Sequence, residues 1–265
     1  MSAIETAADR LWEAARTAVP CDPVRDLIGA DDLDAAYRVQ ALLTERRLAD
    51  GQRLVGRKIG LTSAAVQVQL GVDQPDFGPL FAHQVHADGA ALDRATFVAP
   101  RVEAEVALVL AEDLTHPEHT VLDVVAATAY ALPAIEVVDS RVRDWDIRIT
   151  DTVADAASCG ACVVGTRPVA LDDVDLRRIP ATLRVGGEER SSGTGAASLG
   201  HPLRAAVWLA DELVRRGDPL RAGDLVLTGA LGPMVPVAAG DEVEADLGAL
   251  GPVSCSFVGA EVATG

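Results

Sequence analysis

Two glutamates in one strand-like run have the spacing that points most directly to chemistry. Residues 101–110 read RVEAEVALVL, in which apolar residues alternate with Glu103 and Glu105. Alternate side chains of a β-strand share a face, so the two carboxylates lie next to each other. Neighbouring carboxylates on a partly buried strand repel each other, and a divalent cation such as Mg²⁺ or Mn²⁺ compensates for both. A solvated strand face is the alternative interpretation for this pair alone.

A third acid in a second apolar run favours the metal interpretation. Glu136 lies inside LPAIEVVD, residues 132–139, where a charged side chain within a strand needs a partner. Together with Glu103 and Glu105 it predicts a facial site of three carboxylates, with positions left open for water and a bidentate substrate. Asp139 is the substitute third ligand, and an ion pair to an arginine is the alternative role for Glu136.

Lys58 stands out because it is the only lysine among 23 lysine and arginine residues. It lies in VGRKIG, residues 55–60, with Gly56 and Gly60 on the same strand face. Glycines on both sides allow a ligand or another backbone segment to approach the ammonium group closely. A lysine in this position is suited to stabilise a developing oxyanion or to relay a proton. A surface lysine is the alternative interpretation.

Two further polar residues lie in segments that the sequence predicts to be loops. Asp76 belongs to GVDQPDFG, residues 71–78, a turn-rich segment in which an aspartate most often caps a turn. Ser158 lies in the polar stretch 151–159, ahead of a predicted strand, and its hydroxyl is suited to bind a substrate carboxylate. Neither segment alone indicates a function.

Other motifs give little support to different chemistry. Cys159 and Cys162 form a C-x-x-C, but no second pair or histidine lies at zinc-ligand spacing. We expect both to be buried as small apolar residues. The stretch GTGAASLG, residues 193–200, lacks the glycine spacing of a dinucleotide-binding loop. No G-x-S-x-G occurs either, which leaves a serine hydrolase unsupported.

Positioning these residues requires a strand-rich domain after a helical N-terminal segment. Amphipathic patterns predict helices at 2–19, 31–49, 121–132 and 202–216. Apolar runs between glycines and prolines predict strands at 54–59, 102–110, 134–139, 160–165, 181–185, 225–228, 242–246 and 253–258. The strands do not alternate regularly with helices, which favours an α+β fold over a doubly wound parallel sheet. We expect a helical segment at 1–52 and a catalytic domain at 53–265, joined as one structural unit.

Composition argues against several classes of protein. With 23 basic and 40 acidic residues, the formal charge is −17, which disfavours binding to nucleic acid or to anionic membranes. No apolar stretch is long enough to span a bilayer, and the N-terminus lacks the basic and apolar regions of a signal peptide. We therefore expect a globular cytoplasmic protein.

Five segments closely resemble the 2-keto-4-pentenoate (2-hydroxypenta-2,4-dienoate) hydratases of the fumarylacetoacetate hydrolase-like superfamily. They read GRKIGLTSAAVQVQLGVDQPDFGPLF, PRVEAEVALVL, LPAIEVVDSRVRDWDIRITDTVADAASCG, LGHPLRAAVWLA and LRAGDLVLTGALGPMV. Their order and spacing match the family from about residue 30 to 258. The resemblance implies a mixed β-sandwich or roll of the fumarylacetoacetase C-terminal type, and a role in the breakdown of aromatic compounds.

The same resemblance implies roles for individual residues. Six positions match the family's site: the metal ligands Glu103, Glu105 and Glu136, the catalytic Lys58 and Asp76, and the substrate-binding Ser158. The implied metal is Mg²⁺ or Mn²⁺. Ala156 departs from the pattern, because the family usually has asparagine at this position, so we expect this loop to hold the substrate differently.

The resemblance implies hydration of 2-hydroxypenta-2,4-dienoate to 4-hydroxy-2-oxopentanoate by a homo-oligomer, with a pathway decarboxylase or aldolase as a candidate partner. The nearest alternative is 4-oxalocrotonate decarboxylase, which is similar in fold and metal ligands. A related hydratase for a dicarboxylic substrate would need an extra cation in the pocket, for which Arg57 and Arg141 are candidates. A catalytically inert partner subunit is the last alternative, and the intact acidic residues and lysine argue against it.

Overall fold

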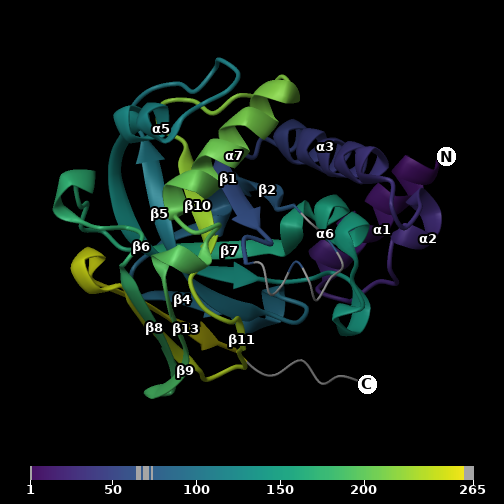
Figure 1. Ribbon diagram of the computed structural model, residues 1–265. Coiled ribbons are helices and arrows are strands. Elements are labelled where there is room, and N and C mark those ends of the chain that lie inside the picture. The colour runs from purple at the N-terminus through teal and green to yellow at the C-terminus, as the bar shows by residue number, and fades with distance from the viewer. Residues whose placement is uncertain (1, 64–66, 68–71, 73, 260–265) are drawn as a thin grey trace.

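Two β-sheets form the centre of the computed structural model, which describes residues 2–63, 67, 72 and 74–259 (Figure 1). The strands of the larger sheet are β1 (Leu54–Gly60), β2 (Asp76–Phe81), β3 (Val85–Ala87), β5 (Arg101–Leu110), β6 (Thr128–Val138), β7 (Cys159–Val164), β10 (Leu225–Ala230) and β11 (Val235–Pro236). Those of the smaller sheet are β4 (Ala90–Asp93), β8 (Pro180–Val185), β9 (Glu188–Thr194), β12 (Glu242–Asp246) and β13 (Pro252–Val258).

The strand order mixes parallel and antiparallel neighbours. The larger sheet runs β2-β1-β10-β5-β6-β7-β3, with β11 paired to β5, and the smaller runs β4-β13-β12-β8-β9. The pairs β1–β10, β3–β7 and β4–β13 are parallel, whereas the other pairs are antiparallel. This arrangement confirms the predicted α+β fold with mixed sheets. All eight predicted strands are present, and the sequence did not predict β2, β3, β4, β9 and β11.

The main core lies between the two sheets and fixes which way the acids point. From β5, Val102, Val106 and Leu108 contribute to this core, together with Leu183 of β8 and Phe257 of β13. Because side chains alternate along a strand, the odd-numbered residues of β5 face the other side of the larger sheet. The carboxylates of β5 therefore point away from the smaller sheet, as predicted.

Six described helices surround the sheets, with α1, α2, α3 and α6 gathered on one side in Figure 1. They are α1 (Ala3–Thr17), α2 (Arg25–Ile28), α3 (Leu33–Ala49), α5 (Val121–Ala127), α6 (Ile149–Ala154) and α7 (Pro202–Arg215). At the start of α3 the Asp32 carboxylate accepts a hydrogen bond from Ala35 N, and beyond its end Gly51 has φ 79°. Among the described residues, no helix could cross a membrane.

The predicted helix at 121–132 is wrong in its second half. α5 ends at Ala127, and the chain continues directly into β6 at Thr128. β6 pairs with β5 on one side and β7 on the other, so its apolar run is buried by neighbours far away in the sequence. Thr128 and Tyr130 also belong to residue types that favour strands. Tertiary pairing therefore overrides the local helical pattern.

The N-terminal helices share a small core with α6. Leu11, Val39 and Val153 belong to this cluster, and the Gln40 side-chain amide donates to the carbonyls of Phe77 and Val153. Since α3 ends at Ala49 and β1 begins at Leu54, the expected boundary at residue 52 falls in the short connection between them. The division into segments 1–52 and 53–265 stays a prediction.

Candidate active site

Three glutamates meet on the face of the larger sheet that points away from the smaller one. Glu103 on β5 lies directly opposite Glu136 on β6, and Glu105 lies two residues further along β5. One carboxylate oxygen of each lies within 4.8 Å of those of the other two. Glu105 and Glu136 are fully buried, so the alternative of a solvated strand face is wrong. The predicted trio is one cluster.

This cluster carries more negative charge than its surroundings compensate. Burial and the charge of Glu136 raise the pKa of Glu103 to about 8, and they raise the pKa of Glu105 well above its ordinary value. Among the described residues, Glu105 Oε1 and Glu136 Oε2 have no hydrogen-bond partner, and Glu136 Oε1 has only an ion pair with Lys58. Since Mg²⁺ and Mn²⁺ prefer carboxylate oxygens, these orphaned buried atoms fit a divalent cation.

Lys58 on β1 provides the single ammonium group beside the trio. Its Nζ lies 3.0 Å from Glu136 Oε1 and donates a 2.9 Å hydrogen bond to the carbonyl of Ala157. Burial acts to lower the pKa of Lys58, but the charges of Glu136 and Asp76 outweigh it and raise that pKa above its ordinary value. Lys58 is therefore a buried cation, and the surface-lysine alternative is wrong. The partner of Glu136 is this lysine and not an arginine.

Asp76 lies in the same pocket, although not in the turn that the sequence predicted. It is the first residue of β2 and pairs across the sheet with Gly60 of β1, while Gly71 and Asp73 of the predicted loop lie outside the described residues. Neither carboxylate oxygen of Asp76 has a hydrogen-bond partner among the described residues, and burial raises its pKa. A Cβ at Gly60 would collide with Asp76 Oδ1 and approach Lys58 Nζ, so glycine keeps this space open.

The predicted polar loop at 151–159 is instead the end of α6 followed by a tight turn, which we call the 155–159 turn. Ala156, Ala157 and Ser158 have φ values of 54°, 52° and 54°, a left-handed conformation that costs residues other than glycine about 1 kcal/mol each. The turn directs the Ala157 carbonyl to Lys58, and it buries Ser158, whose Oγ has no hydrogen-bond partner among the described residues. Ser158 therefore reaches the pocket as predicted.

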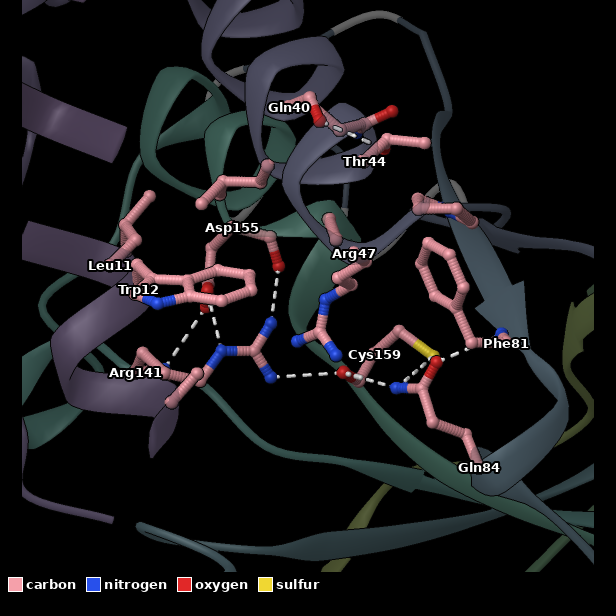
Figure 2. A pocket seen from close by; sticks show the side chains of 14 residues that line it. Leu11, Trp12, Gln40, Thr44, Arg47, Phe81, Gln84, Arg141, Asp155 and Cys159 are labelled. Carbon is pink, nitrogen blue, oxygen red and sulfur yellow. Dashed lines mark hydrogen bonds and ion pairs between the residues drawn. The ribbon is translucent and has the colours of Figure 1, made fainter. Parts of the chain in front are cut away.

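Arg141 holds both ends of the 155–159 turn (Figure 2). Its Nε donates to Asp155 Oδ1 at 2.5 Å, and its terminal nitrogens donate to the carbonyls of Asp139, Asp155 and Cys159. These contacts use the guanidinium for structure, so the candidate role of Arg141 as an extra substrate cation is wrong. Its side chain is a buried clamp that the sequence reasoning missed.

Asp139, the substitute metal ligand, and Arg57, the other candidate cation, do not take part in the pocket. Both carboxylate oxygens of Asp139 accept backbone hydrogen bonds, at 3.0 Å from Val98 N and 2.7 Å from Ala99 N. Asp139 is therefore committed to the backbone and is not a member of the trio. Arg57 pairs with Asp218 and lines a different cavity, between α3 and α7. Neither arginine supplies a second cation to the pocket.

The pocket around these groups is small. A cavity of about 90 Å³ is lined by Lys58, Asp76, Glu103 and Ser158 on its polar side, and by Trp145, Ile147 and Met234 on its apolar side. The sequence analysis did not identify these apolar residues. The one hint in the sequence was Trp145, since the chain has only three tryptophans. Arg101 stacks on the Trp145 ring at 4.1 Å. No arginine or histidine is among the described residues that line the cavity.

Comparison with known proteins agrees with this geometry. The fumarylacetoacetate (FAA) hydrolase C-terminal family matches residues 54–258. A protein named 2-keto-4-pentenoate hydratase from Burkholderia vietnamiensis is 54% identical over 97% of this chain and 98% of its own length. One of the same name from Paraburkholderia phymatum is 55% identical over 96% of this chain and 97% of its own length.

A solved structure resembles the whole fold. It is 4-oxalocrotonate decarboxylase from Pseudomonas putida G7, described as complexed with magnesium and adipate, with a TM-score of 0.93 and 34% identity. The match covers 96% of this chain and 97% of that one. The curated hydratases are more similar in sequence than this decarboxylase. The chain therefore belongs to the fumarylacetoacetate hydrolase family and, within it, to the group of the 2-keto-4-pentenoate hydratases.

Proposed function

We propose that this protein is a metal-dependent hydratase that converts 2-hydroxypenta-2,4-dienoate into 4-hydroxy-2-oxopentanoate. The observation that carries the proposal is the cluster of Glu103, Glu105 and Glu136, whose orphaned oxygens lie beside the buried ammonium of Lys58. Relatives more than 50% identical are named for this activity. Aromatic catabolism is the corresponding biological role.

The cofactor is Mg²⁺ or Mn²⁺, held by Glu103, Glu105 and Glu136. Three carboxylates without cysteine or histidine form a hard donor set, which favours these ions over zinc. Related structures described as complexes with magnesium and with calcium support an ion of this kind. When bound, the ion would withdraw electron density from the substrate oxygens and so stabilise an enolate.

The chain's own residues account for the proton movements. The dienol loses its C2 hydroxyl proton and gains one at C5, and water then adds its hydroxyl at C4 and a proton at C3. Asp76 has a raised pKa, and its oxygens have no hydrogen-bond partner within the described ranges, so it is suited to take up and return these protons. Lys58 keeps its proton, because its pKa is raised, and its Nζ stabilises negative charge. Ser158 Oγ donates to the substrate carboxylate.

The lining of the cavity favours a substrate with one carboxylate. A dicarboxylate needs a second cationic group, and no described lining residue other than Lys58 provides one. Trp145, Ile147 and Met234 instead offer an apolar wall to the far end of the substrate. The five-carbon dienoate is therefore preferred over 4-oxalocrotonate, the substrate of the decarboxylase alternative.

Activity on the freshly generated dienoate tests the proposal. Loss of the diene absorbance should require Mg²⁺ or Mn²⁺, should stop with EDTA, and should yield 4-hydroxy-2-oxopentanoate. Release of CO₂ from 4-oxalocrotonate, without hydration of the dienoate, would establish the decarboxylase instead. Inactivity on both would favour an inert partner subunit. A cytoplasmic location, a homo-oligomer and a pathway decarboxylase or aldolase as partner stay predictions of the sequence.

A further inference from the structure

A second cavity lies on the other side of the 155–159 turn from the candidate active site. We call it the rear cavity, and its walls include Trp12, Arg47, Phe81, Gln84, Arg141 and Cys159 (Figure 2). A narrow inner part of about 20 Å³ adjoins an outer part of about 420 Å³. Asp155 and Ala156 line the rear cavity, whereas Ala157 and Ser158 line the active-site cavity. The two cavities share no described lining residue.

Arg47 is the residue that makes the rear cavity unusual. Its guanidinium carbon lies 5.7 Å from the centre of the Trp12 ring and 5.4 Å from that of Phe81. Its one hydrogen bond within the described residues is a 3.3 Å contact to Gln52 Oε1, and none of the ion pairs among them involves it. The adjacent Arg46, by contrast, pairs with Asp9 at 2.7 Å. Within the described residues, Arg47 is therefore a partly buried cation that forms no ion pair, in a chain of net charge −17.

The acids near Arg47 offset its charge only in part, because Asp155 and Asp50 act to raise its pKa but form no ion pair with it among the described residues. Arg141 adds positive charge beside Arg47, and burial together with Arg141 lowers the pKa of Arg47. The carboxylates of Asp155 and Asp139 are occupied by Arg141 and by backbone amides. The exposed Asp93 accepts from Ala95 N. Burial and Arg141 still outweigh these acids, so a bound anion is the group that would complete the compensation of the Arg47 charge.

His83 and His86 in the outer wall are neutral near pH 7, because burial lowers the pKa of each. Neutral imidazoles offer hydrogen-bond donors without demanding a second negative charge. The remaining wall is apolar and aromatic, with Leu92 and Phe97 in the outer part. The lining thus combines one unpaired guanidinium with flat apolar surface.

We propose that the rear cavity is a second ligand site, which binds a small organic acid through one carboxylate on Arg47 and an apolar body against the aromatic wall. A guanidinium presents paired donors that match the two oxygens of a carboxylate. The aromatic walls favour an organic acid over a bare inorganic anion, since they would desolvate an inorganic ion without contacting it productively. This site goes beyond the hydratase reaction and does not depend on it.

Benzoate is a suitable probe, because it joins one carboxylate to one flat apolar ring. We would titrate it into the full-length protein in EDTA by calorimetry, with benzyl alcohol and sulfate as separate titrants. Saturable binding with a dissociation constant of about 1 mM or tighter is expected for benzoate. Benzyl alcohol, which lacks the charge, and sulfate, which lacks the ring, should each bind at least about tenfold more weakly.

Variants then locate the site. Arg47→Gln should weaken benzoate binding at least about tenfold, while Arg46→Gln, which removes the same charge from the next residue of α3, should leave it unchanged. Arg47→Lys keeps the charge and should retain part of the affinity, which covers the case that Arg47→Gln does not fold. Ser158→Ala should leave binding unchanged, because Ser158 lines the other cavity.

Four results would overturn the proposal. Absence of saturable benzoate binding would remove the site. Equal affinity in wild type and Arg47→Gln would show that the carboxylate binds elsewhere, and loss of binding in Ser158→Ala would place it in the active-site cavity. Sulfate that binds as tightly as benzoate would leave only a nonspecific anion contact.

Discussion

Two buried polar clusters lie on opposite sides of the 155–159 turn, and they differ in how completely their atoms are paired. In front, most of the carboxylate oxygens of Asp76, Glu105 and Glu136 have no hydrogen-bond partner in the part of the chain that the structure describes. Behind, the Arg141 guanidinium and the Asp155 carboxylate are fully engaged with each other and with backbone groups. Since an unpaired buried polar atom is costly, its persistence indicates a missing ligand. We therefore infer that the front cluster binds a ligand, whereas the rear cluster of Arg141 and Asp155 maintains the conformation of the turn.

The same comparison explains why the turn can be strained. Three consecutive residues, 156–158, hold left-handed backbone angles, which the chain would not adopt without support. Arg141 fixes the ends of the turn, and Lys58 holds its middle through the Ala157 carbonyl. The paired cluster thus maintains the geometry in which the unpaired cluster operates.

The largest effect is expected from Glu105→Gln. Hydratase activity should fall by about 10³-fold or more, because a metal ligand is lost. The metal-free variant should unfold at the same or a higher temperature, because one buried charge disappears. In the wild type the Glu105 carboxylate accepts a 2.8 Å hydrogen bond from Gly229 N, which the amide oxygen of glutamine can also accept. Activity assays and thermal unfolding in EDTA measure both. A large loss of stability in Glu105→Gln would contradict the comparison between the two clusters. Glu112→Gln, at an exposed position, is the control and should change neither activity nor stability.

Arg141→Gln should show the opposite pattern. It should lower the free energy of unfolding by about 3–5 kcal/mol, because the Asp155 carboxylate then stays buried without its cation. Denaturant titration measures the loss. Arg143→Gln is the matched control, because Arg143 is exposed and its ion pair with Asp22 is long, at 3.6 Å. This substitution should change the free energy of unfolding by less than about 0.5 kcal/mol. Equal effects of the two variants would contradict the assigned clamp.

The pH dependence of stability gives the rear cluster its own signature. Burial raises the pKa of Asp155 from 3.8 to about 6, although Arg141 acts to lower it. Between these two values the folded protein holds a proton that the unfolded chain has released, so the free energy of unfolding falls as pH rises and levels off above about 6. Asp155→Asn should remove this slope. We would subtract the two stability profiles, and a flat or rising difference would refute the assignment.

The smallest effect concerns the strain of the turn itself. Ala156→Gly should stabilise the protein by about 0.5–1 kcal/mol, because glycine adopts φ 54° without steric cost. Ala41→Gly, at an exposed position within α3, should instead destabilise by about 1 kcal/mol. Thermal unfolding compares the two. Equal signs for both substitutions would show that the turn is not strained.

Much of the front cluster was predictable from the sequence because its signals are local. Strand alternation places Glu103 and Glu105 on one face, and the glycines around Lys58 indicate a close approach. Glu136 could be recognised as a buried acid, whereas its position directly opposite Glu103 depends on the register of two distant segments. Local patterns do not encode such a register.

The rear cluster was not predictable, for a related reason. From the sequence, Asp139 is a substitute third metal ligand, and Arg141 is a candidate extra cation for a dicarboxylic substrate. Their side chains turn to backbone groups and to Asp155 instead. Asp76 was assigned to a turn because Pro75 and Gly78 signal one, while β2 forms only by pairing with β1. Long-range contacts decide all three cases.

Manganese titration tests the central claim most directly. Calorimetry of the metal-free protein should show one Mn²⁺ bound per chain, no specific binding to Glu105→Gln, and unchanged binding to the surface variant Glu112→Gln. That result would establish that the unpaired carboxylates in front of the turn form the metal site. Equal Mn²⁺ binding by wild type and Glu105→Gln, or no binding by wild type, would contradict the account.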